Sequence, residues 1–217
     1  MYLLLFFVLI GALFGLIQVG LLSIAFTKLG LSLEFGFLLL FFSLLGSLIN
    51  IPLFQFKEQL QFPLAPVPKS SQRGFLFPLQ PRRSLQTVIA INMGGGVIPV
   101  FFSFYLFTVY DLDLFLLVVA IITVSFVSYS VSRPIEGLGI GMPILYAPLT
   151  AAIIALVLDP NMSSVIAYIS GTLGVLIGAD LLRMRDIAKL GVPVAAIGGA
   201  GTYDGIFLTG IVAVLLT

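Results

Sequence analysis

Long apolar stretches alternate with short polar connections along almost the whole chain. Seven of them stand out, at about 3–26, 35–54, 85–108, 113–132, 142–158, 163–182 and 190–216. A helix needs about 20 mainly apolar residues to cross the hydrocarbon core of a bilayer. The pattern therefore predicts an all-α fold: a polytopic membrane helical bundle of about seven transmembrane spans, forming one domain over residues 1–217.

Glycine clusters interrupt the third and the seventh of these stretches. The third contains Asn92-Met93-Gly94-Gly95-Gly96 followed by Pro99, and the seventh contains Gly198-Gly199-Ala200-Gly201-Thr202-Tyr203-Asp204. Backbone that is not helical is tolerated at membrane depth only where protein or water satisfies its polar groups. Both spans are therefore predicted to be broken helices. The separate glycines Gly171, Gly174 and Gly178 are typical of close helix packing instead.

The one long polar connection covers residues 55–84. It contains five prolines, namely Pro63, Pro66, Pro68, Pro78 and Pro81. Because proline lacks an amide hydrogen and clashes with the preceding helical turn, this stretch is not a continuous helix. It is predicted to be a proline-rich cytoplasmic loop within the membrane domain.

Composition supports a membrane location and removes several kinds of chemistry. The chain is 60% hydrophobic and 9% charged, with a mean hydropathy of +1.22, whereas soluble domains carry about 25% charged residues. The lipid bilayer is thus the expected surrounding. Cysteine and histidine are absent, so no disulfide, thiolate site, histidine-based catalytic triad, metal site or cofactor is expected. The basic residues are few and scattered, which excludes a nucleic-acid partner.

The distribution of basic residues predicts an orientation. With seven spans, nine of the ten lysines and arginines fall on one side, and only Lys28 falls on the other. Because cytoplasmic loops of membrane proteins are enriched in lysine and arginine, that side is the cytoplasm. The chain is therefore predicted to be a multi-pass protein of the cell (inner or plasma) membrane, with its N-terminus in the cytoplasm and its C-terminus outside.

Two aspartates are the candidate catalytic residues. A charge at the centre of a membrane helix costs about 2.5–3.5 kcal/mol or more, so Asp204 is expected to bind or react with something. Asp180 lies in the preceding span, and two carboxyl groups that share a proton can activate water for amide hydrolysis. Structural roles stay open: Asp180 can pair with Arg183, and Thr202 or Asp204 can cap a restarting helix.

The C-terminal residues carry a resemblance to a known family. Gly178-Ala179-Asp180, followed by Gly198-Gly199-Ala200-Gly201-Thr202-Tyr203-Asp204-Gly205-Ile206-Phe207-Leu208-Thr209-Gly210, resembles the signature of a bacterial and archaeal family of polytopic membrane proteins of unknown function. Asn92 with its glycines and Arg133-Pro134 fit the same family. The resemblance covers most of the chain and implies no established activity.

A second and shorter resemblance involves only the two aspartate motifs. Tyr203-Asp204 and Gly178-Ala179-Asp180 are similar to the motifs of presenilin-like and signal-peptide-peptidase-like intramembrane aspartyl proteases. The order of the two motifs is reversed here, and no Pro-Ala-Leu motif follows. This resemblance implies an intramembrane aspartate-dependent hydrolase acting on a membrane-embedded peptide.

The leading hypothesis is this hydrolase. Asp180 and Asp204 are then the catalytic pair, and the residues that bind or orient substrate are Asn92, Tyr203, Gly199, Gly201 and Thr202. If span seven is a straight helix, Asp180 lies about 5 Å deep and Asp204 about 22 Å deep, too far apart to cooperate. The hydrolase therefore requires residues 191–201 to fold back rather than to span the membrane as a helix.

Two alternatives remain. In a straight span seven, Asn92 and Asp204 meet near the midplane, as in a transporter or channel for a small solute or cation. Such a protein also calls for a homo-oligomer, because seven spans do not divide into two equal repeats. The third hypothesis is a membrane scaffold without catalytic activity.

Overall fold

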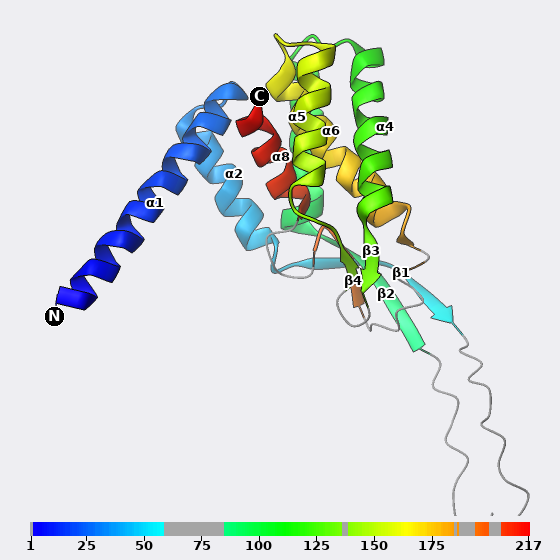
Figure 1. Ribbon diagram of the computed structural model, residues 1–217. Coiled ribbons are helices and arrows are strands. Elements are labelled where there is room, and N and C mark those ends of the chain that lie inside the picture. The colour runs from blue at the N-terminus through cyan, green and yellow to red at the C-terminus, as the bar shows by residue number, and fades with distance from the viewer. Residues whose placement is uncertain (1, 59–84, 136–138, 185, 187–193, 200–204) are drawn as a thin grey trace, which may run out of the picture.

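The structure is a computed structural model that describes residues 2–58, 85–135, 139–184, 186, 194–199 and 205–217. These residues are mostly helical (Figure 1). The α-helices are α1 (Tyr2–Lys28), α2 (Leu33–Gly46), α3 (Ile98–Val109), α4 (Leu114–Val131), α5 (Tyr146–Leu158), α6 (Ser163–Val175) and α8 (Gly205–Leu216). Two π-helical turns are η1 (Met93–Val97) and η2 (Leu176–Leu181). The strands are β1 (Asn50–Glu58), β2 (Leu85–Asn92), β3 (Arg133–Ile135), β4 (Gly139–Gly141) and β5 (Val194–Ile197).

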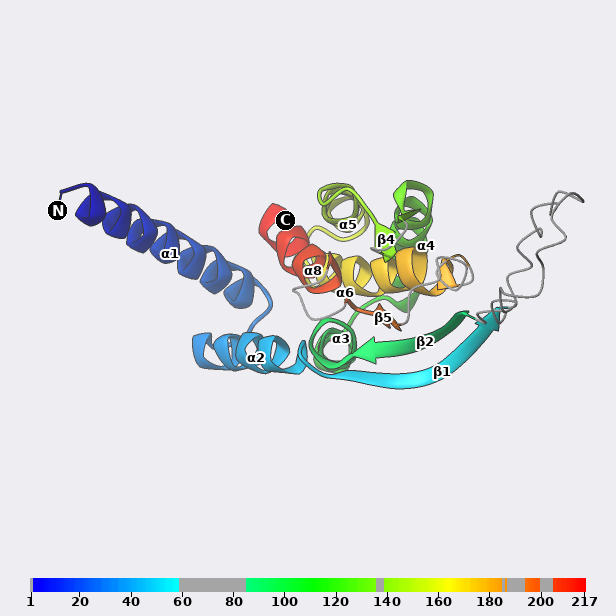
Figure 2. The ribbon, with the colours of Figure 1, turned by 90° about the horizontal axis from the view of Figure 1, so that it is seen from below.

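Helix α6 is the centre of the bundle. It contacts α3, α4, α5 and α8, and every residue from Val165 to Thr172 is buried. Figure 1 shows α4, α5, α6 and α8 grouped together, while α1 leans away from them, and Figure 2 shows the same separation from below. The η2 turn continues α6 to Leu181, so Asp180 lies at the lower end of the most buried helix.

The outer surface of the bundle is apolar. Large hydrophobic side chains such as Phe101, Phe126 and Val157 are at least 70% exposed, which is unusual for the surface of a soluble monomer. Two helices, Leu114–Val131 and Ser163–Leu181, are long and apolar enough to cross a membrane. Counting the pair Gly15–Lys28 and Leu33–Gly46 as one span, despite its bend of 111°, raises the number to three in the described residues.

The prediction of about seven full spans is not confirmed. The other apolar helices, Met93–Val109, Tyr146–Leu158 and Ile206–Leu216, have between 10 and 17 residues. At 1.5 Å per residue they extend no more than about 26 Å, below the roughly 30 Å of hydrocarbon that a spanning helix must match. The apolar stretches at 35–54, 85–108 and 190–216 are shared between helix and strand, and this shortens their helices.

A three-stranded sheet corrects the all-α prediction. Its order is β1-β2-β5, with β1 antiparallel and β5 parallel to β2. Strand β2 is rich in valine, isoleucine and threonine, which suit a pleated surface, and it occupies the centre. Pro52 is accommodated on the edge strand β1 next to a register shift, because an edge strand can lack one amide donor. Hydropathy alone does not separate a short apolar strand from a helix.

The sheet occupies one end of the bundle, the lower end in Figure 1. Helix α4 runs toward this end and is followed there by the β3–β4 hairpin, in which Arg133 pairs with Gly141. At the opposite end, the Asp113 carboxylate caps α4 by accepting hydrogen bonds from the amides of Phe115 and Leu116, at 2.8 and 3.3 Å. Asp113 thus fixes where α4 begins. Residues 59–84, most of the predicted proline-rich loop, lie outside the described residues, while its first residues belong to β1.

The third and seventh apolar stretches are interrupted, but a strand precedes each interruption where a helix is predicted. In the third, β2 leads through η1 into α3. In the seventh, β5 ends at Ile197 and is followed by Gly198 and Gly199, which both have a positive φ (+81° and +85°), and α8 begins at Gly205. Because β5 pairs with β2 in parallel, with Ile91 opposite Ile197, the two interruptions lie side by side.

Candidate functional site

A cavity of about 290 Å³ lies where the lower end of α6 faces α8 and the start of α5. Asp180 on η2 is its one ionisable side chain among the described residues, and it is half-buried. A π-helical turn inside an α-helix is frequent at functional sites, because the extra residue redirects a side chain. The cavity is otherwise mainly apolar, and its remaining lining residues are Ile140, Met142, Ile144, Pro148, Val175, Ala179, Leu208, Thr209 and Val212.

The Asp180 carboxylate is bound by a glycine break. We use this name for the two places where glycines interrupt an apolar stretch, namely Gly94-Gly95-Gly96 and Gly198-Gly199. Asp180 Oδ2 accepts a hydrogen bond of 3.0 Å from the backbone amide of Gly198. A side chain at Gly198 would collide with the backbone of Gly95 and Gly96, so the two glycine breaks touch backbone to backbone. This close contact brings the turn after β5 to Asp180, and it requires glycine for both space and conformation.

Residues 194–199 therefore do not form a helix through the membrane. They form strand β5 and a turn in which Gly198 is hydrogen-bonded to Asp180, near the end of α6. A continuous helix through span seven is wrong, because residues 194–197 form strand β5 and Gly198 is hydrogen-bonded to Asp180 on η2. The shortened helix α8 begins only at Gly205.

Asn92 lies at the other glycine break, and its carboxamide is engaged with protein groups. Its Oδ1 accepts a hydrogen bond of 2.8 Å from the Gly95 amide, which caps η1. Its Nδ2 donates to the Ser47 carbonyl oxygen at 2.7 Å and to Asn50 Oδ1 at 3.0 Å. The side chain is fully buried. These contacts stabilise the junction of α2, β1 and η1, and a part in substrate binding stays a prediction.

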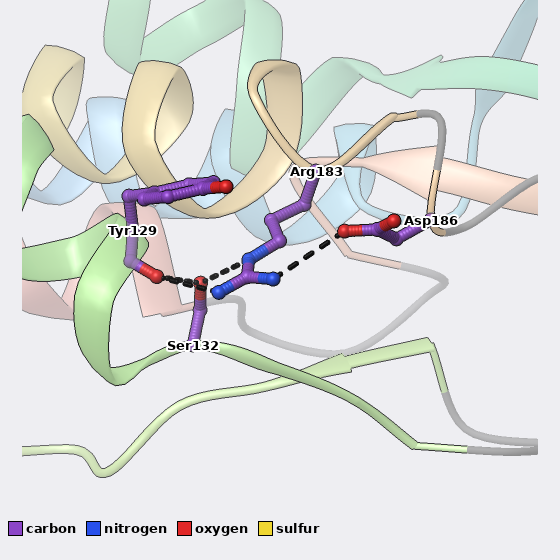
Figure 3. Close-up of polar contacts among 4 residues, drawn as sticks. All are labelled: Tyr129, Ser132, Arg183 and Asp186. Carbon is purple, nitrogen blue, oxygen red and sulfur yellow. Dashed lines mark hydrogen bonds and ion pairs between the residues drawn. The ribbon is translucent and has the colours of Figure 1, made fainter.

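Arg183 joins the end of η2 to the end of α4 (Figure 3). Its guanidinium donates to the Tyr129 carbonyl oxygen at 2.8 Å and to Ser132 Oγ at 3.2 Å, and it lies 4.3 Å from the centre of the Tyr129 ring. Asp186 forms an ion pair with it at 3.3 Å. Arg183 thus satisfies a terminal carbonyl group of α4 and holds η2 in place. In the described part of the chain Arg183 therefore contacts Tyr129, Ser132 and Asp186, and not Asp180, with which the sequence suggested an ion pair.

Two glycines bring α6 and η2 close to α4. A side chain at Gly174 would overlap Val124, and one at Gly178 would overlap the Ser125 carbonyl oxygen. Gly174 and Gly178 are four residues apart and face α4, the small-xxx-small arrangement of closely packed membrane helices. This confirms the predicted packing role. Gly178 and Ala179 directly precede Asp180, so the same contact sets where the carboxylate lies.

The other predicted site residues are placed as follows. Gly199 is half-buried and directly follows the amide that binds Asp180. Gly201, Thr202, Tyr203 and Asp204 lie outside the described residues. Thr209 was not predicted, although it belongs to the Phe207-Leu208-Thr209-Gly210 part of the signature, and it lines the cavity with Asp180. In the described part of the chain, no group of three aspartates or glutamates could hold a metal ion.

Comparison with known proteins places the chain in a family. No curated protein and no solved structure matches it. One family model, described as "Protein of unknown function (DUF1614)", matches residues 44–216. That range contains both glycine breaks, the Asp180 cavity and Arg183. The chain therefore belongs to the family of unknown function DUF1614.

Proposed function

We propose that the protein is a membrane-embedded hydrolase in which Asp180 and Asp204 form a pair of catalytic carboxyl groups beside the 290 Å³ cavity. The observation that supports this most is the hydrogen bond from the Gly198 amide to Asp180 Oδ2, at 3.0 Å. A catalytic pair requires the chain before Asp204 to fold back to the end of α6. The hydrogen bond supports this requirement, because it holds Gly198 beside Asp180.

Described residues on both sides of the segment that carries Asp204 lie near Asp180. On one side Gly198 is hydrogen-bonded to Asp180. On the other side Leu208 and Thr209, in the first turns of α8, line the cavity together with Asp180. Asp204 is bonded directly to Gly205, where α8 begins. The bond from Gly198 therefore favours Asp180 as the partner of Asp204. Asn92 is less suited, because its carboxamide is already bonded to Gly95, Ser47 and Asn50.

The proposed chemistry needs only these carboxyl groups and water. One carboxylate removes a proton from a water molecule, whose oxygen attacks the carbonyl carbon of an amide bond. The other carboxyl group donates a proton to the leaving nitrogen as the carbon–nitrogen bond breaks. The two groups titrate as a coupled pair, so neither is assigned as base or acid. The apolar cavity lining suits an aliphatic segment of a membrane-embedded peptide.

The test combines cleavage with a measurement that needs no known substrate. The purified protein is incubated in vesicles with a panel of synthetic membrane-spanning peptides, and the products are identified by mass spectrometry. We expect cleavage by the wild type and by Asp113→Asn, the matched control at the opposite end of the bundle, and none by Asp180→Asn or Asp204→Asn. In parallel, infrared spectra at neutral pH should show a protonated carboxyl band that both active-site variants lose. Cleavage retained by either variant would sink the proposal.

A small-solute or cation transporter is the second candidate, and one observation favours it. The glycine breaks at Gly95–Gly96 and Gly198 are in direct backbone contact, and interrupted segments that meet in this way build the substrate sites of several transporter folds. Ion or solute flux into reconstituted vesicles is the measurement. Flux that is unchanged by Asp204→Asn would exclude this candidate.

We also propose the orientation that the basic residues predict. The sheet end, with Arg133 and Arg183, faces the cytoplasm, and the end with Asp111 and Asp113 faces outside. Among the described residues β1 and β5 are the edge strands of the sheet. This is consistent with a place at the membrane surface, because open strand edges are not tolerated in lipid. The N-terminus is then cytoplasmic and the C-terminus external.

A further inference from the structure

A second hollow in the surface lies beside the Asp180 cavity, on the other side of the β3–β4 hairpin. It is a groove of about 740 Å³ between the end of α4, the hairpin and the start of α5. Ile140 lines the Asp180 cavity, Gly141 lines the groove, and Met142 lines both. The two hollows therefore adjoin at the hairpin, and nothing in the proposed hydrolysis uses the second one.

Arg133 supplies the charge of this groove. It is exposed and directly follows Ser132, the residue after α4. Its guanidinium has no hydrogen bond or ion pair with any residue in the part of the chain that the structure describes. Nearby, Arg183 binds Ser132, and its charge is balanced by Asp186. The described charges at this end of α4 thus leave one arginine without a counter-ion.

The remaining wall of the groove is apolar and wide open to the surroundings. Ile135 and Tyr146 are 43% and 55% exposed, and Met142 lines the groove with them. Helix α4 is long and apolar enough to cross a membrane, so a residue directly after its end lies at the level of lipid phosphate groups. A cation at that level beside an apolar groove matches the two parts of an anionic phospholipid, namely its charged headgroup and its acyl chains.

We propose that this groove binds one anionic phospholipid, with its phosphate on the Arg133 guanidinium and an acyl chain along Ile135, Met142 and Tyr146. Arginine suits this task because its planar guanidinium donates two parallel hydrogen bonds to a phosphate. An interfacial cation attracts anionic lipid by about 1 kcal/mol, which corresponds to about a fivefold preference for anionic over zwitterionic lipid.

Native mass spectrometry of the detergent-purified full chain, titrated with phosphatidylglycerol or phosphatidylcholine, tests the proposal. The wild type should bind phosphatidylglycerol about fivefold more tightly. Arg133→Gln should remove this preference, whereas Arg133→Lys should keep most of it. The matched control is Lys28→Gln, a charge removed at the opposite end of the bundle, and it should keep the full preference.

Three results would overturn the proposal. The first is an equal affinity of the wild type for both lipids. The second is a preference that persists in Arg133→Gln, which would place the anionic lipid elsewhere. The third is competition by free glycerol phosphate at the concentrations at which phosphatidylglycerol binds, which would identify a soluble phosphate compound as the ligand.

Discussion

Gly198 donates its backbone amide to the Asp180 carboxylate across 3.0 Å, although the two residues are 18 positions apart in the chain. This bond links the end of the central helix to the glycine break that precedes α8. Gly198 makes this bond with a φ of +81°, at a place where a Cβ would overlap the backbone of Gly95 and Gly96. The candidate site therefore depends on glycines as much as on the aspartate.

Replacing Gly198 with alanine should destabilise the protein by at least about 2 kcal/mol, because a side chain adds left-handed strain and overlaps backbone atoms. Thermal unfolding in detergent measures the effect. The control is Gly20→Ala in α1, where no atom lies within 4 Å of the added methyl group, and which should be neutral or slightly stabilising. An equally stable Gly198→Ala protein would contradict the contact between the two breaks.

Two glycines on the same helix should respond differently to alanine. At Gly178 the methyl group would overlap the Ser125 carbonyl oxygen, which belongs to rigid backbone, so we expect a loss of about 1–3 kcal/mol. At Gly171 it would meet Ala151 and Thr209 at 3.4 Å, an ordinary van der Waals distance. Gly171→Ala should therefore change the unfolding temperature little. The reverse ranking in thermal unfolding would show that α6 packs differently.

Asn92→Leu should lower the stability by at least about 2 kcal/mol. It removes the cap of η1 and leaves the buried Gly95 amide and Ser47 carbonyl without partners. Asn50→Ala is the milder control, because it removes only the hydrogen bond between the two asparagines. Chemical denaturation in mild detergent compares them. If Asn92→Leu were as stable as the wild type and altered only solute flux, the transporter hypothesis would gain.

Arg183→Lys should cost about 1–3 kcal/mol despite the retained charge. Lysine does not reproduce the fork of hydrogen bonds to Tyr129 and Ser132 or the stacking on the Tyr129 ring. Asp186→Asn should cost less than about 1 kcal/mol, because its ion pair is partly exposed. Unfolding temperatures rank the two variants, and a larger loss for Asp186→Asn would argue that the ion pair dominates.

The proposed orientation can be checked by labelling single cysteines, since the natural chain contains none. Asp111→Cys, in the exposed turn between α3 and α4, should react with a membrane-impermeant maleimide in intact cells. Pro134→Cys, exposed on β3, should react only after the membrane is opened. The reverse pattern would invert the orientation. Reaction of both residues from one side would show that α4 does not cross the membrane.

The amino-acid sequence by itself determined the class of the protein and where its chain is interrupted. Sixty per cent hydrophobic residues with 9% charge predict an apolar surrounding, and Gly94-Gly95-Gly96 and Gly198-Gly199 mark the two breaks. The packing role of Gly174 and Gly178 also followed from their spacing. Each of these conclusions depends only on composition or on residues close together in the chain, so it can be drawn from the sequence alone.

Only the tertiary structure decided what lies on either side of the breaks. Valine, alanine and isoleucine in 194–197 fit a short strand or a buried helix equally well, and pairing with β2 selects the strand. Strands within the predicted spans also explain why the described residues contain two or three possible membrane-spanning helices instead of about seven. Likewise, Asn92 could be recognised as a polar residue at a break, but its bond to Ser47, which follows α2 and lies 45 residues away, depends on the tertiary structure. Long-range backbone pairing, which no local pattern encodes, brought Gly198 to Asp180.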